Sequence, residues 1–295
     1  MERRIYVSAT TDQSLDERRR QVKAAIVRKI CEAGYQPQQF WEMGRAANLA
    51  WNFDNVDRIM RECIGCIVIG FPRWVMSDQG QAIRLAGEYH HYEGAVAVTL
   101  GLPMMILAED GVEDRGILWR GGGRAITRLP SDATQEWLDG SEFGAKFAAW
   151  LQVLASRKDI FLGYCSKSAG TAAQVQLLLQ QHGATVHNWA MDFRTGSSIL
   201  DELEAARATC TCGVFIFSED DPLEDASGGA APRDNVVFEA GYFISSKGAS
   251  RCLIIRENEA KMPADLGGSI YISLDRKAGV SAIEGKLIRF LESAF

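Results

Sequence analysis

The carboxylate of Glu239 is the group in this 295-residue chain whose setting best suits chemistry. It lies in the early turns of a predicted helix with the apolar body 236–238, and Asp234 or Asn235 is expected to cap that helix. In open α/β sheets such helix starts lie near the carboxyl ends of the strands, where ligands bind. A carboxylate there can hold ligand hydroxyls and stabilise developing positive charge. A structural explanation is also open, because the helix dipole stabilises such a carboxylate by about 0.3–1 kcal/mol.

A second carboxylate, Glu93, has a comparable place in the first half of the chain. Tyr92-Glu93 aligns with Phe238-Glu239, and each pair is followed by a predicted strand. The candidate residues of a site in this half are Glu93, Glu88 and Ser8. A helix surface explains Glu88 equally well.

Alternating strands and helices are expected to position these residues. Buried strands of parallel sheets appear as continuous apolar runs, and helices show apolar residues at a spacing of three or four. In the first half the predicted strands are 5–8, 66–70 and 103–108, with helices over 22–34, 56–60, 93–101 and 143–154. In the second half the predicted strands are 160–164, 185–189 and 213–218, with helices over 172–181 and 198–206. The chain is therefore predicted to be an α/β protein with two parallel-sheet domains in tandem, 1–156 and 157–295.

The composition narrows the classes of function. Hydrophobic residues make up 47% of the chain and charged residues 24%, with a net charge of −6. No apolar run approaches the roughly 20 residues that cross a bilayer, and no secretory signal is recognisable, so we expect a cytoplasmic protein without a membrane partner. The negative charge disfavours direct nucleic-acid binding.

The seven cysteines are expected to be reduced thiols. Cys63-x-x-Cys66 and Cys210-x-Cys212 could together offer four ligands to zinc. Each pair runs into an apolar strand, where small buried residues are expected, so no metal site is predicted.

Three segments of the second half together resemble the TIR-like domain of bacterial predicted nucleotide-binding proteins, which are effectors of cyclic-nucleotide antiphage systems. The segments are 217–222, 232–244 and 263–272, and 196–203 resembles a loop and helix of the same family. The resemblance covers about residues 158–295. It implies a flavodoxin-like fold, NAD⁺ as the substrate rather than a cofactor, and Glu239 as the catalytic residue.

The resemblance also implies where the substrate would bind. Trp189, Phe193 and Ser198 lie on or near the loop that approaches the nucleotide in TIR domains, where an aromatic ring can stack on a base. For Trp189, packing in the core is an equal alternative. For Asp220, a turn or capping role is at least as good an explanation. The full set of candidate substrate-binding residues is Cys165, Ser166, Trp189, Phe193, Ser198, Asp220 and Asn235.

The first half weakly resembles nucleoside deoxyribosyltransferase-like and TIR-like domains through the segment 88–107, in which Glu93 would be the nucleophile. We expect this half to sense a nucleotide second messenger or to mediate assembly into a homo-oligomer, and the second half to hydrolyse NAD⁺ as a glycohydrolase effector in antiphage defence. Three alternatives stay open: a TIR-type cyclase that makes a cyclic ADP-ribose signal, a non-catalytic nucleotide-binding or TIR interaction module, and deoxyribosyl transfer by Glu93.

Overall fold

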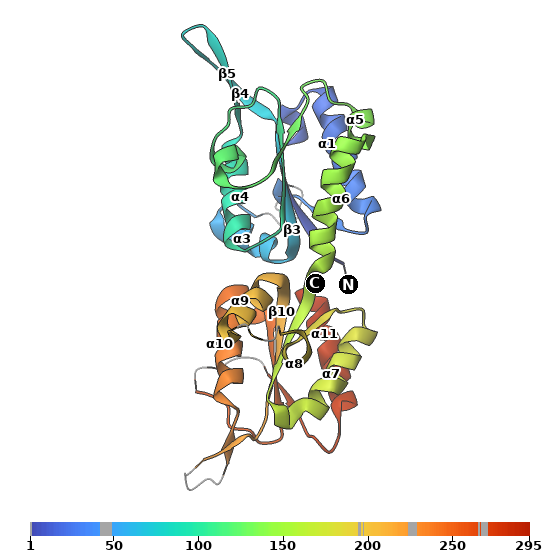
Figure 1. Ribbon diagram of the computed structural model, residues 1–295, viewed down its shortest axis with the longest axis vertical. Helices are drawn as coiled ribbons and strands as arrows, with labels where there is room; N and C mark the ends of the chain where they lie inside the picture. Colours follow the sequence, from blue (N-terminus) through green and yellow to red (C-terminus); the bar gives the residue numbers. More distant parts are fainter. Residues whose placement is uncertain are drawn as a thin grey trace. The chain divides into compact units, whose positions relative to one another are not determined.

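The computed structural model describes residues 2–41, 49–193, 196, 198–223, 229–264, 266 and 271–295. The chain divides into two compact units, Glu2–Ala155 (the N-unit) and Ser156–Phe295 (the C-unit), one residue away from the division expected from the sequence (Figure 1). Each unit has its own sheet and its own core.

The N-unit is built on a five-stranded parallel sheet with the order β2-β1-β3-β6-β7. Its strands are β1 (Arg4–Ala9), β2 (Gln36–Gln38), β3 (Cys63–Gly70), β6 (Met104–Glu109) and β7 (Ile126–Leu129). Helices α1 (Glu17–Glu32), α5 (Gln135–Asp139) and α6 (Ser141–Ser156) pack on one face. Helices α3 (Phe53–Arg61) and α4 (Glu88–Thr99) pack on the other. Every residue of β3 is buried, as expected for the central strand of a parallel sheet.

The C-unit repeats this plan with a parallel sheet of order β14-β13-β10-β8-β9. Its strands are β8 (Lys158–Tyr164), β9 (Val186–Asn188), β10 (Cys210–Phe217), β13 (Cys252–Glu257) and β14 (Tyr271–Leu274). Helices α7 (Ala169–Gln181) and α11 (Glu284–Ala294) cover one face. Helices α9 (Ile199–Thr209) and α10 (Asp234–Lys247) cover the other, and the short helix α8 (Trp189–Asp192) follows β9 (Figure 1).

Counted along the chain, both units have the strand order 2-1-3-4-5, which is the flavodoxin-like order. The prediction of two parallel-sheet α/β domains is therefore confirmed. In detail, β9 is shorter than expected, because Trp189 already begins α8. Helix α4 begins five residues earlier than expected, at Glu88, so Glu93 lies in its second turn.

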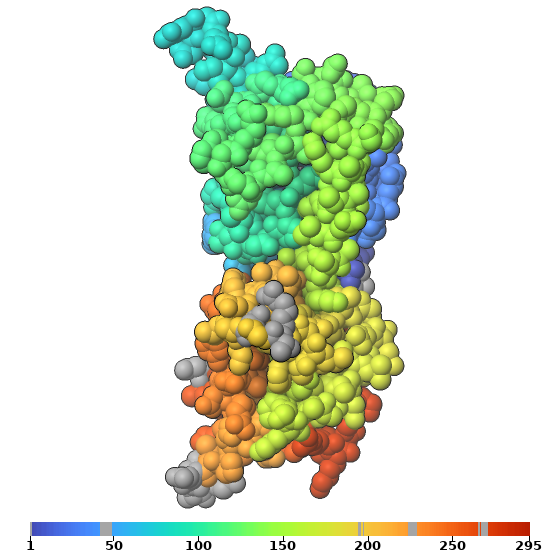
Figure 2. All heavy atoms as spheres, in the orientation of Figure 1, coloured from blue at the N-terminus to red at the C-terminus, as the bar shows by residue number. Residues whose placement is uncertain are grey.

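A hairpin that the sequence did not predict separates β3 from α4. Strands β4 (Pro72–Asp78) and β5 (Gln81–Ala86) pair antiparallel around Gln79 and Gly80, both of which have positive φ. Two such residues form the turn that suits the twist of a two-residue hairpin. Figure 2 shows the hairpin standing out from the body of the N-unit.

Two further features bear on the classes of function considered above. Both candidate zinc pairs lie inside central strands, Cys63 and Cys66 in β3 and Cys210 and Cys212 in β10, and all four side chains are buried. Among the described residues, no helix combines the length and the apolar character needed to span a bilayer.

Candidate active site

A pocket of about 490 Å³ opens where β8 and β9 end in the C-unit. Segments from the β8–α7 loop, from α8 and from the start of α10 meet there. Its lining residues are Tyr164, Cys165, Ser166, Trp189, Ala190, Phe193, Ile199, Arg233, Asn235, Val236 and Glu239. Six of the predicted residues are thus brought together at one pocket, namely Cys165, Ser166, Trp189, Phe193, Asn235 and Glu239.

Helix α10 carries Glu239 as its sixth residue. Val236, Ala240 and Phe243 of α10 are buried against the sheet, and this spacing orients the helix around its axis. The expectation that Asp234 or Asn235 caps the helix was wrong. Arg233 occupies the N-cap position without a side-chain cap, and its backbone N–H donates instead to the carboxylate of Asp220, 3.0 Å away.

The carboxylate of Glu239 lies against β8 in a gap that a glycine leaves open. A Cβ atom placed on Gly163 would lie 2.7 Å from Glu239 Oε2 and 2.7 Å from the ring of Phe215. Oε2 is buried and finds no hydrogen-bond partner among the described residues. Because burial disfavours the charged form, it raises the pKa of Glu239 to about 7. A buried carboxylate oxygen without a partner is costly to the fold, which is typical of a functional group.

Aromatic side chains form another part of the pocket wall. The indole N–H of Trp189 donates to the carbonyl of Tyr164 at 2.9 Å, which fixes the ring at the end of β8. Phe193 packs at 6.4 Å from the Trp189 ring and at 6.2 Å from the Phe161 ring, measured between centroids. Trp189 therefore both packs in the core and lines the pocket, so the two explanations offered for it hold together.

Two predicted residues lie outside this lining. Ser198 caps α9, where its hydroxyl accepts from the backbone N–H of Asp201. Asp220 is only 2% exposed, and its carboxylate bonds to other protein groups rather than facing the pocket. In both residues, hydrogen bonds to other protein groups hold the side chain outside the pocket lining.

Sequence reasoning missed Arg233, Tyr164, Ala190, Ile199 and Val236 in the lining. Arg233 is the charged one, and its guanidinium pairs with Asp221 at 3.2 Å while both side chains stay about half exposed. Its place immediately before the helix of Glu239 could have revealed it, since the start of that helix was expected to face the site.

The N-unit residues Glu93 and Ser8 also meet, whereas Glu88 is engaged elsewhere. Glu93 is 3% exposed and accepts from the Tyr6 hydroxyl at 2.8 Å and from the Trp51 indole at 3.3 Å. Burial raises its pKa, while hydrogen bonds from Ser8, Tyr6 and Trp51 oppose that rise. Glu88 accepts from Trp74 of the hairpin.

A buried histidine completes this polar group. His90 is hydrogen-bonded to Ser8 and Thr10, each at 3.1 Å. Burial lowers the pKa of His90 to about 4, so it is neutral at pH 7.

Comparison with known proteins places the pocket in a characterised type of domain. Residues 159–276 match the family described as "CAP12/Pycsar effector protein, TIR domain". That range contains every residue of the pocket lining. The resemblance to bacterial TIR-like effectors is thereby confirmed for the C-unit.

Two curated relatives agree with this match. The chain is 29% identical over 124 residues to CD-NTase-associated protein 12 of Sphingobacterium faecium, covering 42% of this chain and 38% of that protein. It is 30% identical over 114 residues to the Pycsar effector protein BcPycTIR of Burkholderia cepacia, covering 37% of each. The TIR domain of a Toll-related receptor from Hydra magnipapillata aligns with a TM-score of 0.36 and 10% identity, over 47% of this chain and 99% of that one. The chain thus matches about two fifths of the length of these two curated relatives.

Proposed function

Taking residues 159–276 as a TIR domain related to those of CAP12 and Pycsar effectors, we propose that the C-unit hydrolyses NAD⁺ at the bond between nicotinamide and ribose. The observation that carries the proposal is Glu239, a carboxylate at the pocket whose Oε2 is buried without a partner among the described residues. Such a group is available to a ligand. No cofactor takes part, since NAD⁺ is the substrate.

The chemistry asks for a carboxylate and no general acid. The electron pair of the glycosidic C–N bond leaves with nicotinamide, whose ring nitrogen loses its positive charge, so nothing needs to protonate the leaving group. Positive charge then develops on the ribose, and the Glu239 carboxylate stabilises it. Water attacks the anomeric carbon and loses a proton, which gives ADP-ribose.

The pocket lining supports this substrate in three ways. Trp189 and Phe193 offer rings on which a pyridinium or a base can stack. Arg233 offers a cation for a diphosphate. Glu239 has a pKa of about 7, so it is partly protonated at neutral pH, and the positive charge of a bound pyridinium favours its ionised form.

The function of the whole chain extends this proposal. We propose that it is an effector of antiphage defence, in which the N-unit binds a nucleotide second messenger and the active state is a homo-oligomer. The names of the relatives support an effector role, because they include Pycsar effector proteins and CD-NTase-associated proteins.

The test is release of nicotinamide from NAD⁺ by purified protein at high concentration, with and without cyclic nucleotides. Glu239→Gln should abolish release, whereas Asp234→Asn, which removes an exposed carboxylate of the same helix outside the pocket lining, should not. Chromatography of the ribosyl product separates hydrolysis from cyclisation. Full release by Glu239→Gln would reject the proposal.

A further inference from the structure

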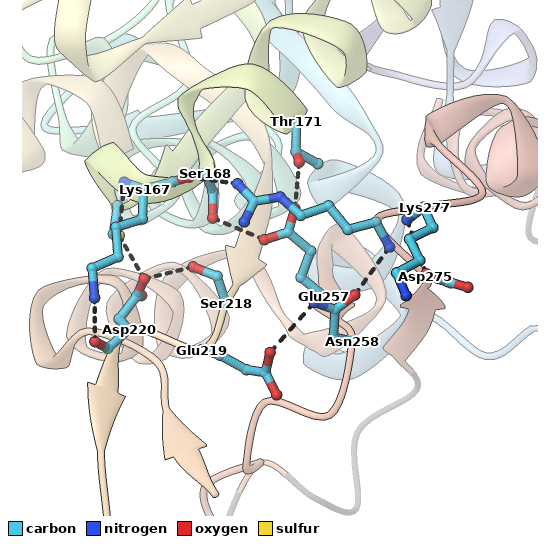
Figure 3. Close-up of polar contacts among 12 residues, drawn as sticks. Lys167, Ser168, Thr171, Ser218, Glu219, Asp220, Glu257, Asn258, Asp275 and Lys277 are labelled. Atoms are coloured by element: carbon cyan, nitrogen blue, oxygen red, sulfur yellow. Dashed lines mark hydrogen bonds and ion pairs between the residues drawn. The ribbon is translucent and has the colours of Figure 1, made fainter.

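Asp220 is a buried carboxylate next to the pocket whose hydrogen bonds reach its own loop and two other segments of the chain. Its Oδ1 accepts from the Cys165 thiol at 2.8 Å and from the Ser218 hydroxyl at 2.9 Å. Its Oδ2 accepts from the backbone N–H of Arg233 at 3.0 Å, and its own carbonyl accepts from Lys167 Nζ at 2.5 Å. Figure 3 shows Lys167 reaching Asp220 from the segment after β8, whereas Ser218 lies on the same loop as Asp220.

Two of these partners lie on separate walls of the pocket. Cys165 follows β8 and opens the loop that leads into α7, whereas Arg233 immediately precedes the helix of Glu239. Both residues line the pocket, but Asp220 does not. The Asp220 carboxylate therefore connects the two walls from outside the lining. Its Oδ1 bonds to Cys165 and its Oδ2 to Arg233.

We propose that Asp220 is a positioning residue that fixes the distance between the Cys165 wall and the Arg233 wall and so sets how tightly the pocket holds its ligand. The part of the proposal that concerns the ligand rests on the proposed function. The connection that Asp220 makes between the two walls is independent of the proposed function.

The geometry calls for a side chain that accepts hydrogen bonds on both of its terminal atoms. Three donors converge on the two oxygens, and a carboxylate accepts on both, whereas an asparagine amide accepts on one and donates from the other. In Asp220→Asn the amide NH₂ group replaces one of the two oxygens. It therefore faces another donor, either the Arg233 N–H or the Cys165 thiol with the Ser218 hydroxyl. One wall is released while the size of the side chain is kept.

The thiol of Cys165 gives a readout that is independent of catalysis. Burial raises the pKa of this thiol, and the hydrogen bond to Asp220 raises it further, whereas the Ser218 hydroxyl lowers it. Because the thiolate is the reactive form, the rate of alkylation reports the contact. The assay uses a Cys31→Ser background, since Cys31 is the exposed cysteine of the chain.

The experiment follows iodoacetamide labelling of Cys165 by mass spectrometry between pH 7 and 10. Asp220→Asn should shift the profile toward lower pH and raise the rate at pH 8 about tenfold. Ser218→Ala removes the hydroxyl that lowers the pKa of the Cys165 thiol, so it should shift the profile the other way and slow labelling about twofold to threefold. Unchanged profiles in both variants would overturn the proposal.

Two control variants separate positioning from general damage. Glu219→Gln changes the neighbouring exposed carboxylate, which contacts Asn258, and should keep the wild-type profile. Glu257→Gln removes another buried carboxylate at this edge of the sheet, which accepts hydrogen bonds from Ser168 and Thr171 (Figure 3) and forms an ion pair with Arg276 at 3.4 Å. None of these three partners lines the pocket. Glu257→Gln should lower stability without shifting the Cys165 profile. A shift as large as that of Asp220→Asn would contradict a specific tie.

Kinetics provide the readout that depends on the proposed function. In Asp220→Asn the KM for NAD⁺ should rise about tenfold with kcat within about threefold of wild type, because Glu239 itself is untouched. A loss of kcat at unchanged KM would overturn the positioning role. If the wild type does not cleave NAD⁺, the proposed function fails, while the labelling profiles still decide whether Asp220 ties the walls.

Discussion

Glu93 and Glu239 occupy the same place in two units of the same topology, yet their surroundings differ. Each is the sixth residue of the helix that lies between the third and fourth strands of its sheet. Glu93 receives hydrogen bonds from Tyr6 and Trp51. Glu239 lines a pocket, and its Oε2 has no partner among the described residues.

The position of a carboxylate in a fold therefore does not by itself make it reactive. A carboxylate whose lone pairs are satisfied by protein donors stabilises the structure, and its loss leaves those donors unpaired. A carboxylate that is desolvated without partners weakens the structure but is available to a ligand. The comparison therefore favours a structural role for Glu93 and a chemical role for Glu239.

The largest expected effect is on the stability of the N-unit in Glu93→Ala. The change leaves the Tyr6 hydroxyl and the Trp51 indole without an acceptor in a buried site and opens a cavity, so we expect a loss of about 3 kcal/mol or more. Hydrogen exchange measured on peptides of α4 and β1 would report it. Peptides of the C-unit are the internal control. A loss below about 1 kcal/mol would show that Glu93 is not a structural group.

The next largest effect is on activity in Gly163→Ala. The added methyl group would meet Glu239 Oε2 and the Phe215 ring, so the carboxylate must move. A displacement of about 1 Å can lower the rate about 100-fold, and we expect a loss of that size in NAD⁺ cleavage. Gly241→Ala is the matched control, because a Cβ on that glycine of α10 meets nothing within 4 Å. Equal activity in both variants would show that the fit against β8 is unimportant.

A smaller effect is expected in Glu239→Gln, which should stabilise the C-unit, whereas Glu93→Ala destabilises the N-unit. The folded state raises the pKa of Glu239 from the ordinary value of 4.5 to about 7, so it binds more protons than the unfolded state between these values. The contribution of Glu239 to stability therefore falls as the pH rises through this window. The full effect at pH 8 would be about 3 kcal/mol, and solvent screening of the partly exposed side chain reduces it. Removing the charge should therefore stabilise the C-unit by about 2 kcal/mol at pH 8 and by almost nothing at pH 4.5. Thermal melts at the two pH values test this, and the same gain at both would contradict it.

The last expected effect is the pH dependence of kcat/KM for the wild type. If the ionised form of Glu239 acts, kcat/KM should rise about tenfold per pH unit below pH 7 and level off above it, because this parameter follows the free enzyme. Glu219→Gln should show the same profile. A flat profile from pH 5 to 8 would contradict the role of a desolvated carboxylate.

Local sequence patterns predicted the elements that carry the two carboxylates. The apolar runs of β3 and β10 marked the central strands, and the periodicity of α10 placed Glu239 near a helix start. The partners of the carboxylates were not predictable, because they come from distant parts of the chain. Tyr6 lies 87 residues before Glu93, and Cys165 lies 55 residues before Asp220.

Two other predictions were wrong or missing, the cap of α10 and the β4–β5 hairpin. The capping role expected for Asp234 or Asn235 was overridden by Asp220, which accepts from the backbone at the helix start. The β4–β5 hairpin was missed because Trp74, Val75 and Met76 form an exposed apolar run, and burial is what such a run usually indicates.

The most direct measurement compares Glu239→Gln with Glu93→Gln in one nicotinamide-release assay at high protein concentration, with cyclic nucleotides added. We predict that Glu239→Gln lowers the rate about 100-fold or more, since it removes the charge that stabilises the ribosyl cation. Glu93→Gln keeps an acceptor for Tyr6 and should stay within about threefold of wild type. Wild-type release by Glu239→Gln, or an equal loss in both variants, would contradict the distinction between the two carboxylates.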